Sequence, residues 1–347
     1  MFLKKSKKFL IFTAGFLFLL GTIIVGVSLG SVSIPMGASA QILWNAIWGI
    51  PTHIDETYQT IVLQIRLPRA MLAALVGAAL AMAGAAFQGL LRNPLADPYT
   101  LGVSSGAALG AVLVLFLGWT LPVIGDFTLP VVSIITGFLT LFVLLGFVRF
   151  IERKLTTETI ILAGIIISSF LGSVISLLIA LTGEELRQII SWLMGSVAMR
   201  GWDYVWLMLP FFIVGALLLM ASRKELNALV FGEDTAKTLG VNTERKRVMI
   251  LAGASLLTGS AVAVSGTIGF VGLVVPHLMR LLFGPDHQSL VPLSAIFGAG
   301  FLVITDVTAR TLIAPTELPI GVITAIVGAP VFGLLLFHER RRRIKVT

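Results

Sequence analysis

Long apolar segments recur along this chain and make up most of it. They lie near residues 9–29, 60–91, 98–117, 128–149, 158–181, 204–221, 248–268, 270–283, 290–312 and 318–337. A helix needs about 20 apolar residues to cross the hydrocarbon core of a bilayer. Backbone groups in lipid must be satisfied internally, and within single apolar segments only an α-helix achieves this. We therefore predict an all-α, polytopic membrane protein with about ten transmembrane helices.

Composition supports one membrane domain spanning residues 1–347. Hydrophobic residues make up 57% of the chain and charged residues 12%, and no polar stretch is long enough for an ordinary soluble domain. The formal net charge of +8 does not indicate nucleic-acid binding, because the basic residues gather at the chain ends and in short loops. Membrane lipid is the expected surrounding. The absence of Cys excludes disulfides and thiolate metal sites.

Basic residues flank both ends of the chain. Lys4, Lys5, Lys7 and Lys8 precede the first apolar segment, and Arg340 to Arg343 with Lys345 follow the last. Cytoplasmic flanks are enriched in such residues, so both termini are predicted to be cytoplasmic. An even number of crossings is then required, and stretch 248–283 counts as two spans rather than one span with a re-entrant tail. The first segment exceeds a signal-peptide core of about 7–15 residues, which favours a retained span over cleavage near Ala40.

Small residues crowd the stretch from Arg66 to Ala111. Its glycines include Gly77, Gly84, Gly102, Gly106 and Gly110. No hydrophobic effect drives helices together in lipid, so their contact depends on close backbone approach, which small residues permit. The glycines predict tightly packed helices, either around a transport pathway or as packing without further significance.

A short pattern is repeated in the two halves of the chain. Leu75-x-Gly77-Ala78-x-Leu80 recurs as Leu251-x-Gly253-Ala254-x-Leu256. In the ten-span topology the first copy runs inward and the second outward. Opposed copies are typical of the inverted repeats of transporters, so we predict an inverted-repeat-like arrangement.

Three arginines lie at the predicted outer ends of their helices, against the positive-inside trend: Arg66, Arg69 and Arg310. Arg66 and Arg69 are three residues apart and share a helix face. Arginine binds carboxylates in a bidentate manner. The group is therefore a candidate docking site for an acidic partner outside the membrane, and the alternative is local pairing with Asp55, Glu56 or Glu317.

The longest predicted inner loop covers about residues 225–247. Within it, Gly232 to Gly240 reads as a short helix with acidic residues in the first turn, an i,i+4 pair of Glu233 and Lys237, and a glycine stop at Gly240. This helix could contact a soluble partner. A solvated connector is the alternative.

Enzymatic motifs do not occur in the chain. No Lys follows a Gly, so there is no Walker A loop. The four His residues lack metal-ligand spacing. We expect no catalytic residue and no metal site. No pair of carboxylates lies mid-span, which weakens the alternative of an ion-coupled secondary carrier.

Three ordered motifs nevertheless strongly resemble the permease subunits of ABC importers for iron-siderophores, haem and vitamin B12. They are Arg66-Leu67-Pro68-Arg69 with Gly77 to Gln88 and Asn93-Pro94-Leu95-Ala96; Gly266 to Arg280 with Asp306-x-x-Ala309-Arg310; and Glu317-Leu318-Pro319-Ile320-Gly321 to Phe332. The likeness covers essentially the whole chain.

The resemblance implies ten helices in each of two permease copies, identical or paralogous, in the cytoplasmic membrane of a bacterium. It also implies a cytoplasmic ATPase dimer that binds ATP and Mg²⁺, while this chain binds no cofactor. An extracytoplasmic binding protein would deliver the substrate. A ferric siderophore is the first candidate for that substrate, and vitamin B12 and haem are the alternatives. The chain itself would be a transport subunit that makes no chemical bond.

The resemblance also assigns roles to residues. Arg66, Arg69 and Arg310 would receive acidic residues of the binding protein. The ATPase would contact Gly232, Glu233, Asp234, Ala236, Lys237, Leu239 and Gly240. Thr157 lies where the family narrows its cytoplasmic gate, and the adjacent Glu158 departs from the small polar residue often found there.

Overall fold

The computed structural model describes residues 5–30, 32–51, 53–152 and 155–344. The predictions that rest on Lys4 and Lys345, and on the side chains of Lys5 and Arg340 to Arg343, lie outside the described part.

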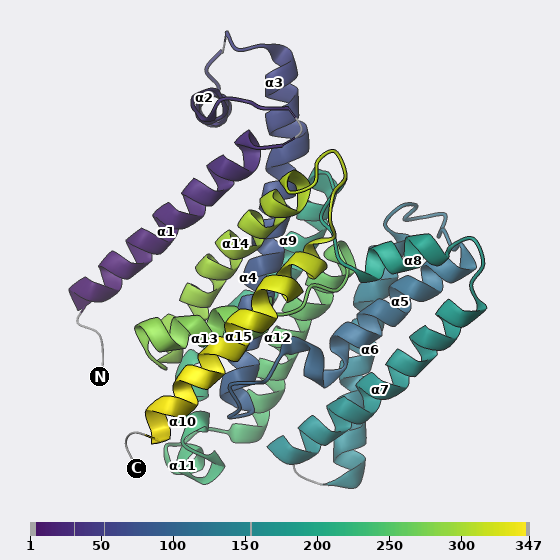
Figure 1. Ribbon diagram of the computed structural model, residues 1–347. Helices are drawn as coiled ribbons and strands as arrows, with labels where there is room; N and C mark the ends of the chain where they lie inside the picture. The colour runs from purple at the N-terminus through teal and green to yellow at the C-terminus, as the bar shows by residue number, and fades with distance from the viewer. Residues whose placement is uncertain (1–4, 31, 52, 153–154, 345–347) are drawn as a thin grey trace.

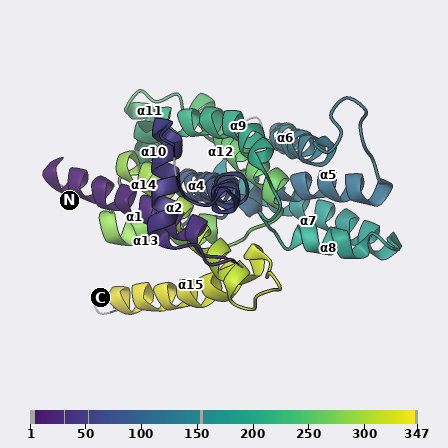
Figure 2. The same cartoon turned by 90° about the horizontal axis from the view of Figure 1, so that it is seen from above.

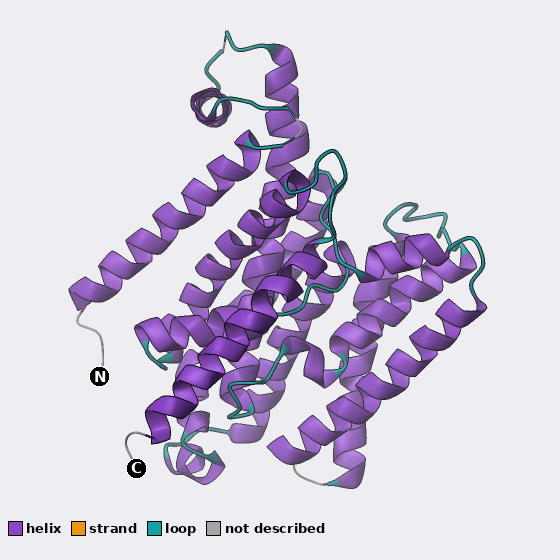
Figure 3. Cartoon of the chain, viewed as in Figure 1, coloured by secondary structure: helices purple, strands orange, loops and turns teal. Residues whose placement is uncertain are grey.

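Every regular element in the described ranges is helical (Figure 3), which confirms the all-α prediction. The elements are α1 Lys5–Ser28, α2 Met36–Trp48, α3 Glu56–Thr60, the π-helical η1 Ile61–Arg66, α4 Leu67–Leu90, the 3-10 helix η2 Pro98–Leu101, α5 Val103–Leu117, α6 Thr128–Ile151, α7 Thr157–Leu181, α8 Leu186–Leu193, α9 Trp202–Ala221, α10 Arg223–Val230, α11 Glu233–Thr238, α12 Thr243–Ser265, α13 Val271–Phe283, α14 His287–Thr311 and α15 Ile320–Ile344.

The helices account for the ten apolar segments. Within the described residues, seven helices are long and apolar enough to cross a membrane: α1, the continuous helix Glu56–Leu90, α6, α7, α9, α12 and α14. Three shorter apolar helices, Val103–Leu117, Val271–Phe283 and Ile320–Leu335, match the remaining segments. The stretch 248–283 is two helices, α12 and α13, with a break between them.

Two helices form the centre of the bundle. In the apolar windows of Glu56–Leu90 and α12, 89% and 83% of residues are buried, against 22% in α1 and 17% in α7. Figures 1 and 2 show α9, α12 and α14 around α4, with α5, α6 and α7 on one side and α1 on the other. The two copies of the repeated pattern lie in α4 and α12, which run in opposite directions (Figure 1).

Glycines bring the central backbones into contact. A Cβ at Gly77 would lie 2.2 Å from the carbonyl oxygen of Gly298 in α14, and one at Gly84 would lie 1.8 Å from that of Gly272 in α13. In α5, a Cβ at Gly106 or Gly110 would overlap a threonine of α6 at 1.9 or 2.1 Å. These contacts need glycine, as the small-residue pattern predicts. Gly102, the N-cap residue just before α5, has a φ of +82°, in the left-handed region.

The bundle has two distinct ends. We call the end that carries α2 and α3 the outer end, and the end that carries α10, α11 and both termini the inner end (Figure 1). The helix α2 lies between the predicted apolar segments 9–29 and 60–91, where no helix was predicted. It forms because one face, including Ile42, packs against the core, and Gly49 ends it in the left-handed region.

Candidate docking and coupling sites

At the outer end, Arg69 of α4 lies between two carboxylates. Its Nε and Nη2 donate to Asp306 Oδ1 at 2.9 and 2.8 Å. Its Nη1 and Nη2 donate to Glu317 Oε1 and Oε2 at 2.9 and 3.0 Å, a bidentate pair. The Asp306 side chain is 1% exposed and that of Glu317 is 41% exposed. The guanidinium therefore has one buried partner and one that solvent reaches.

Arg66 and Arg310 are held mainly by backbone carbonyl groups. Arg66 Nη1 donates to the carbonyl oxygens of Val27 and Ser28 at 3.1 and 2.6 Å, and its Nη2 donates to that of Val32. Arg310 Nη2 donates to the carbonyl oxygen of Gly26 at 2.5 Å. Both side chains are buried. The ends of α1, α4 and α14 are thus joined by guanidinium groups that bind carbonyl groups at the C-terminus of α1 and just after it.

Part of this cluster was predicted from the amino-acid sequence. The three arginines do lie at one end, and Arg69 pairs with Glu317, as the local-pairing alternative expected. Asp55 instead caps α3, where its side chain accepts a hydrogen bond from Thr57 N at 2.7 Å. Asp306 was not predicted as a partner of these arginines, although the spacing Asp306-x-x-Ala309-Arg310 was an available signal. Arg310 Nε lies 3.6 Å from Asp306 Oδ2, one helical turn away.

At the inner end, α11 has the predicted form. Glu233 pairs with Lys237 at 2.9 Å and with Arg247 of α12 at 3.1 Å. The hydrogen bond from Lys237, with that from Arg247, holds the pKa of Glu233 below its usual value. Gly232 and Gly240 have φ values of +112° and +80°, which favour glycine at both ends of the helix. A short helix, its internal ion pair and its glycine stop are confirmed.

The side chains of α11 and its flanks divide into buried and exposed sets. Ala236 is fully buried and anchors the helix, whereas Phe231 and Leu239 are 75% and 66% exposed. Asp234 is fully exposed. Large exposed apolar side chains on a polar segment are typical of a protein-protein contact.

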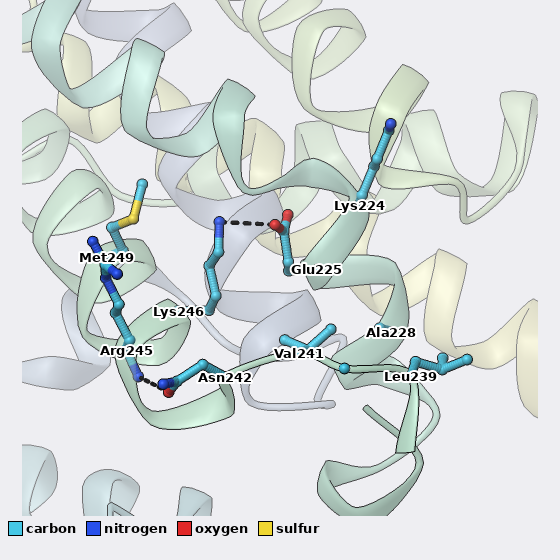
Figure 4. A pocket seen from close by; sticks show the side chains of 10 residues that line it. Lys224, Glu225, Ala228, Leu239, Val241, Asn242, Arg245, Lys246 and Met249 are labelled. Carbon is cyan, nitrogen blue, oxygen red and sulfur yellow. Dashed lines mark hydrogen bonds and ion pairs between the residues drawn. The ribbon is translucent and has the colours of Figure 1, made fainter. Parts of the chain in front are cut away.

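A cavity of about 790 Å³ lies beside this segment, between α10 and the start of α12. Figure 4 shows Lys246 reaching across it to Glu225, with Leu239 at the far rim. The Lys246 Nζ to Glu225 Oε1 distance is 2.8 Å. This ion pair and the Arg247–Glu233 pair join α10 and α11 to α12.

Thr157 is the first residue of α7. The preceding Thr156 caps that helix, since its Oγ1 accepts a hydrogen bond from Thr159 N at 3.3 Å and donates to Glu152 Oε2 at 2.8 Å. Thr157 is half-buried and Glu158 is exposed at the inner end. Among the described residues, no cluster of three or more His, Cys, Asp or Glu is placed to hold a metal ion.

The amino-acid sequence matches the FecCD transport family over residues 17–338. It is 56% identical to the uncharacterized ABC transporter permease protein YvrB of Bacillus subtilis, over 97% of this chain and 96% of that protein. It is 40% identical to the cobalamin import system permease protein BtuC of Halobacterium salinarum, over 91% of this chain and 88% of that protein. An inward-facing metal-chelate type ABC transporter superimposes with a TM-score of 0.82 at 34% identity, covering 95% of this chain and 99% of the other.

Proposed function

We propose that the substrate of this permease is a metal chelate, because the chain belongs to the FecCD transport family and is a multi-pass ABC importer permease. The structural match to a metal-chelate type transporter over 95% of the chain carries this proposal. Cobalamin, the substrate named for the relative from Halobacterium salinarum, is itself a metal chelate. A ferric siderophore is the first candidate, and vitamin B12 and haem are the alternatives.

In this proposal an ATPase dimer binds at the inner end, which is cytoplasmic, and supplies all the ATP and Mg²⁺ chemistry. Its contact is the segment around α11, where Phe231 and Leu239 are exposed. ATP binding and hydrolysis displace α11, and the Glu233–Arg247 pair carries the displacement to α12. Because α12 packs against α4 at the centre of the bundle, this motion switches the pathway between outward and inward access. A second permease copy completes the pathway.

A substrate-binding protein docks at the outer end, on Arg69, Arg66 and Arg310. The exposure of the two carboxylate partners of Arg69 determines which of them the binding protein can replace. Asp306 is enclosed, but Glu317 reaches solvent while it occupies the outer edge of Arg69. An acidic residue of the binding protein takes the place of Glu317 on that guanidinium. Exchange of one carboxylate for another keeps the buried cation paired throughout, which avoids the large cost of leaving it alone.

Uptake measurements test the substrate. Cells that depend on this permease are grown without iron and offered radiolabelled ferric siderophores, haem and cobalamin separately. We expect uptake of one metal chelate, and uptake that stops when the Walker lysine of the partner ATPase is changed. Uptake of none of these chelates would contradict the proposed substrate class.

A further inference from the structure

A groove opens between the inner ends of three membrane helices, outside the coupling segment. Its volume is about 560 Å³. It is lined by Arg149 of α6, Leu218 of α9, Asn242, and Glu244, Arg245, Val248, Met249 and Ala252 of α12. It adjoins the cavity of Figure 4 through Asn242, Arg245 and Met249. Arg149 and Arg245 belong to neither the docking site, the coupling segment nor the gate.

The groove is polar at one end and apolar at the other. Arg149 and Arg245 lie at the inner rim, while Val248 and Ala252 follow Arg245 along α12 toward the middle of the membrane. Seven residues of helix separate Arg245 from Ala252, which is about 10 Å at 1.5 Å per residue. A molecule with a charged head and an apolar tail matches this arrangement.

The helices that border the groove carry large exposed apolar side chains. Phe142 and Phe150 of α6 are 67% and 89% exposed, and Val214 and Leu217 of α9 are 49% and 63% exposed. Figure 2 shows α6 and α9 on the side of the bundle away from α15. The groove therefore opens onto the hydrocarbon region, and a lipid molecule enters it without crossing the protein.

The charge at the rim favours an anion. Arg149 is 60% exposed, and its Nη2 lies 3.6 Å from Glu244 Oε1, too far for a hydrogen bond. Arg245 is also exposed. Two guanidinium groups accompany a single, loosely placed carboxylate, so the rim keeps a net positive charge. Basic pockets between membrane helices on the cytoplasmic side bind anionic lipid headgroups.

We propose that this groove binds an anionic phospholipid of the inner leaflet. Its phosphate lies between Arg149 and Arg245, and one acyl chain lies along Leu218, Val248 and Ala252. The bound lipid stabilises the first turns of α12, the helix whose Arg247 forms an ion pair with Glu233 of α11. The lipid site does not depend on which substrate the permease carries.

Native mass spectrometry of the full-length permease tests this proposal. The protein is extracted from vesicles of equal parts phosphatidylglycerol and phosphatidylcholine, and the retained lipids are counted. We expect retention of phosphatidylglycerol over phosphatidylcholine. The double variant Arg149→Gln/Arg245→Gln should lose about five-fold in retention per arginine, because each cation near an anionic surface contributes a factor of that order.

Two further variants separate the alternatives. The control Lys7→Gln/Lys224→Gln removes two exposed inner-end cations outside the groove and should retain the lipid. Ala252→Phe fills the apolar end and should expel the lipid without touching the arginines. Equal retention of both lipids, or equal loss in the control, would overturn the proposal. So would unchanged retention in Ala252→Phe together with competition by inorganic phosphate, since the site would then bind only phosphate.

Discussion

Asp306 Oδ1 accepts hydrogen bonds from both Nε and Nη2 of Arg69, at 2.9 and 2.8 Å, although the two residues are 237 positions apart. The Asp306 side chain is 1% exposed and also lies near Arg310. This carboxylate is the shared counter-ion of two arginines, and it ties α4 to α14 where the helices reach the outer end.

Removing the charge of Asp306 should destabilise the protein strongly. In Asp306→Asn, Arg69 and Arg310 lose their buried counter-ion, and breaking such a pair costs about 3–5 kcal/mol. Glu317→Gln alters a partly exposed pair worth about 0–1 kcal/mol. Thermal melting of the purified permease, followed by size-exclusion chromatography, should show a large loss of Tm in the first variant and a small one in the second. Equal losses would mean that the two carboxylates are equivalent.

Glu317 should compete with the binding protein for Arg69. Glu317→Gln frees the outer edge of the guanidinium, so the Kd for the binding protein should fall by about five-fold, the equivalent of one exposed ion pair. Surface plasmon resonance on permease in nanodiscs measures this. Glu56→Gln removes one exposed outer carboxylate away from Arg69 and serves as the control for net charge. A weaker complex in Glu317→Gln than in the control would contradict the exchange.

The glycines of α4 should tolerate no side chain. A Cβ at Gly84 meets the carbonyl oxygen of Gly272 at 1.8 Å, so Gly84→Ala must separate two backbones and costs at least about 1–3 kcal/mol. Gly146 of α6 has nothing within 4 Å of such a Cβ. Gly146→Ala is therefore the matched control, and its Tm should be unchanged or higher because Ala favours helix over Gly. Similar yields and Tm values for both variants would refute the close packing.

Hydrophobic patterning predicted the helices well because each apolar segment of sufficient length has one solution in lipid. The glycine pattern also predicted the contacts at Gly77 and Gly84. By contrast, α2 was not predicted. Its 13 residues are too few to span a membrane, so the hydrophobic pattern assigns them to a loop. Its formation depends on the packing of Ile42 against the core, a tertiary effect.

The outer site was only partly predictable for a similar reason. The positive-inside rule marked Arg66, Arg69 and Arg310 as exceptions. Glu317 was one of three acidic residues in the local-pairing alternative. Long-range pairing with Asp306, and the carbonyl groups at the end of α1 that hold Arg66, depend on how α1, α4 and α14 meet. At the inner site all the signals for α11 were local, which is why its bounds and its internal ion pair were anticipated.

The Glu233–Arg247 pair should transmit motion between α11 and α12. In Glu233→Gln both ion pairs of that side chain are weakened, so ATP hydrolysis by the assembled transporter should continue with reduced transport per ATP. Lys7→Gln removes an exposed charge at the inner end of α1, away from α11 and α12, and should transport normally. Uptake and phosphate release, both measured in the same proteoliposomes, give the number of substrate molecules transported per ATP hydrolysed. An unchanged ratio in Glu233→Gln would exclude this pair as the mechanical link.

Lowering the pH should destabilise α11. The Lys237 hydrogen bond lowers the pKa of Glu233 from its usual 4.5. A carboxyl group with a lowered pKa in the folded state stabilises the fold above its usual pKa, and this stabilisation is lost as the pH falls through the lowered value. Amide-exchange protection factors for residues 234–239 should therefore be constant from neutral pH down to about 4.5 and fall below it. Glu233→Gln should have low protection throughout.

The energy source of uptake distinguishes an ATP-driven importer from an ion-coupled carrier. The permease is reconstituted with its ATPase and binding protein in proteoliposomes, and uptake of the metal chelate is followed with ATP alone, with an ion gradient alone, and with ATP plus an uncoupler. We predict uptake whenever ATP is present, unaffected by the uncoupler, and none with the gradient alone. Uptake that persists without ATP and collapses with the uncoupler would contradict the account and identify an ion-coupled carrier.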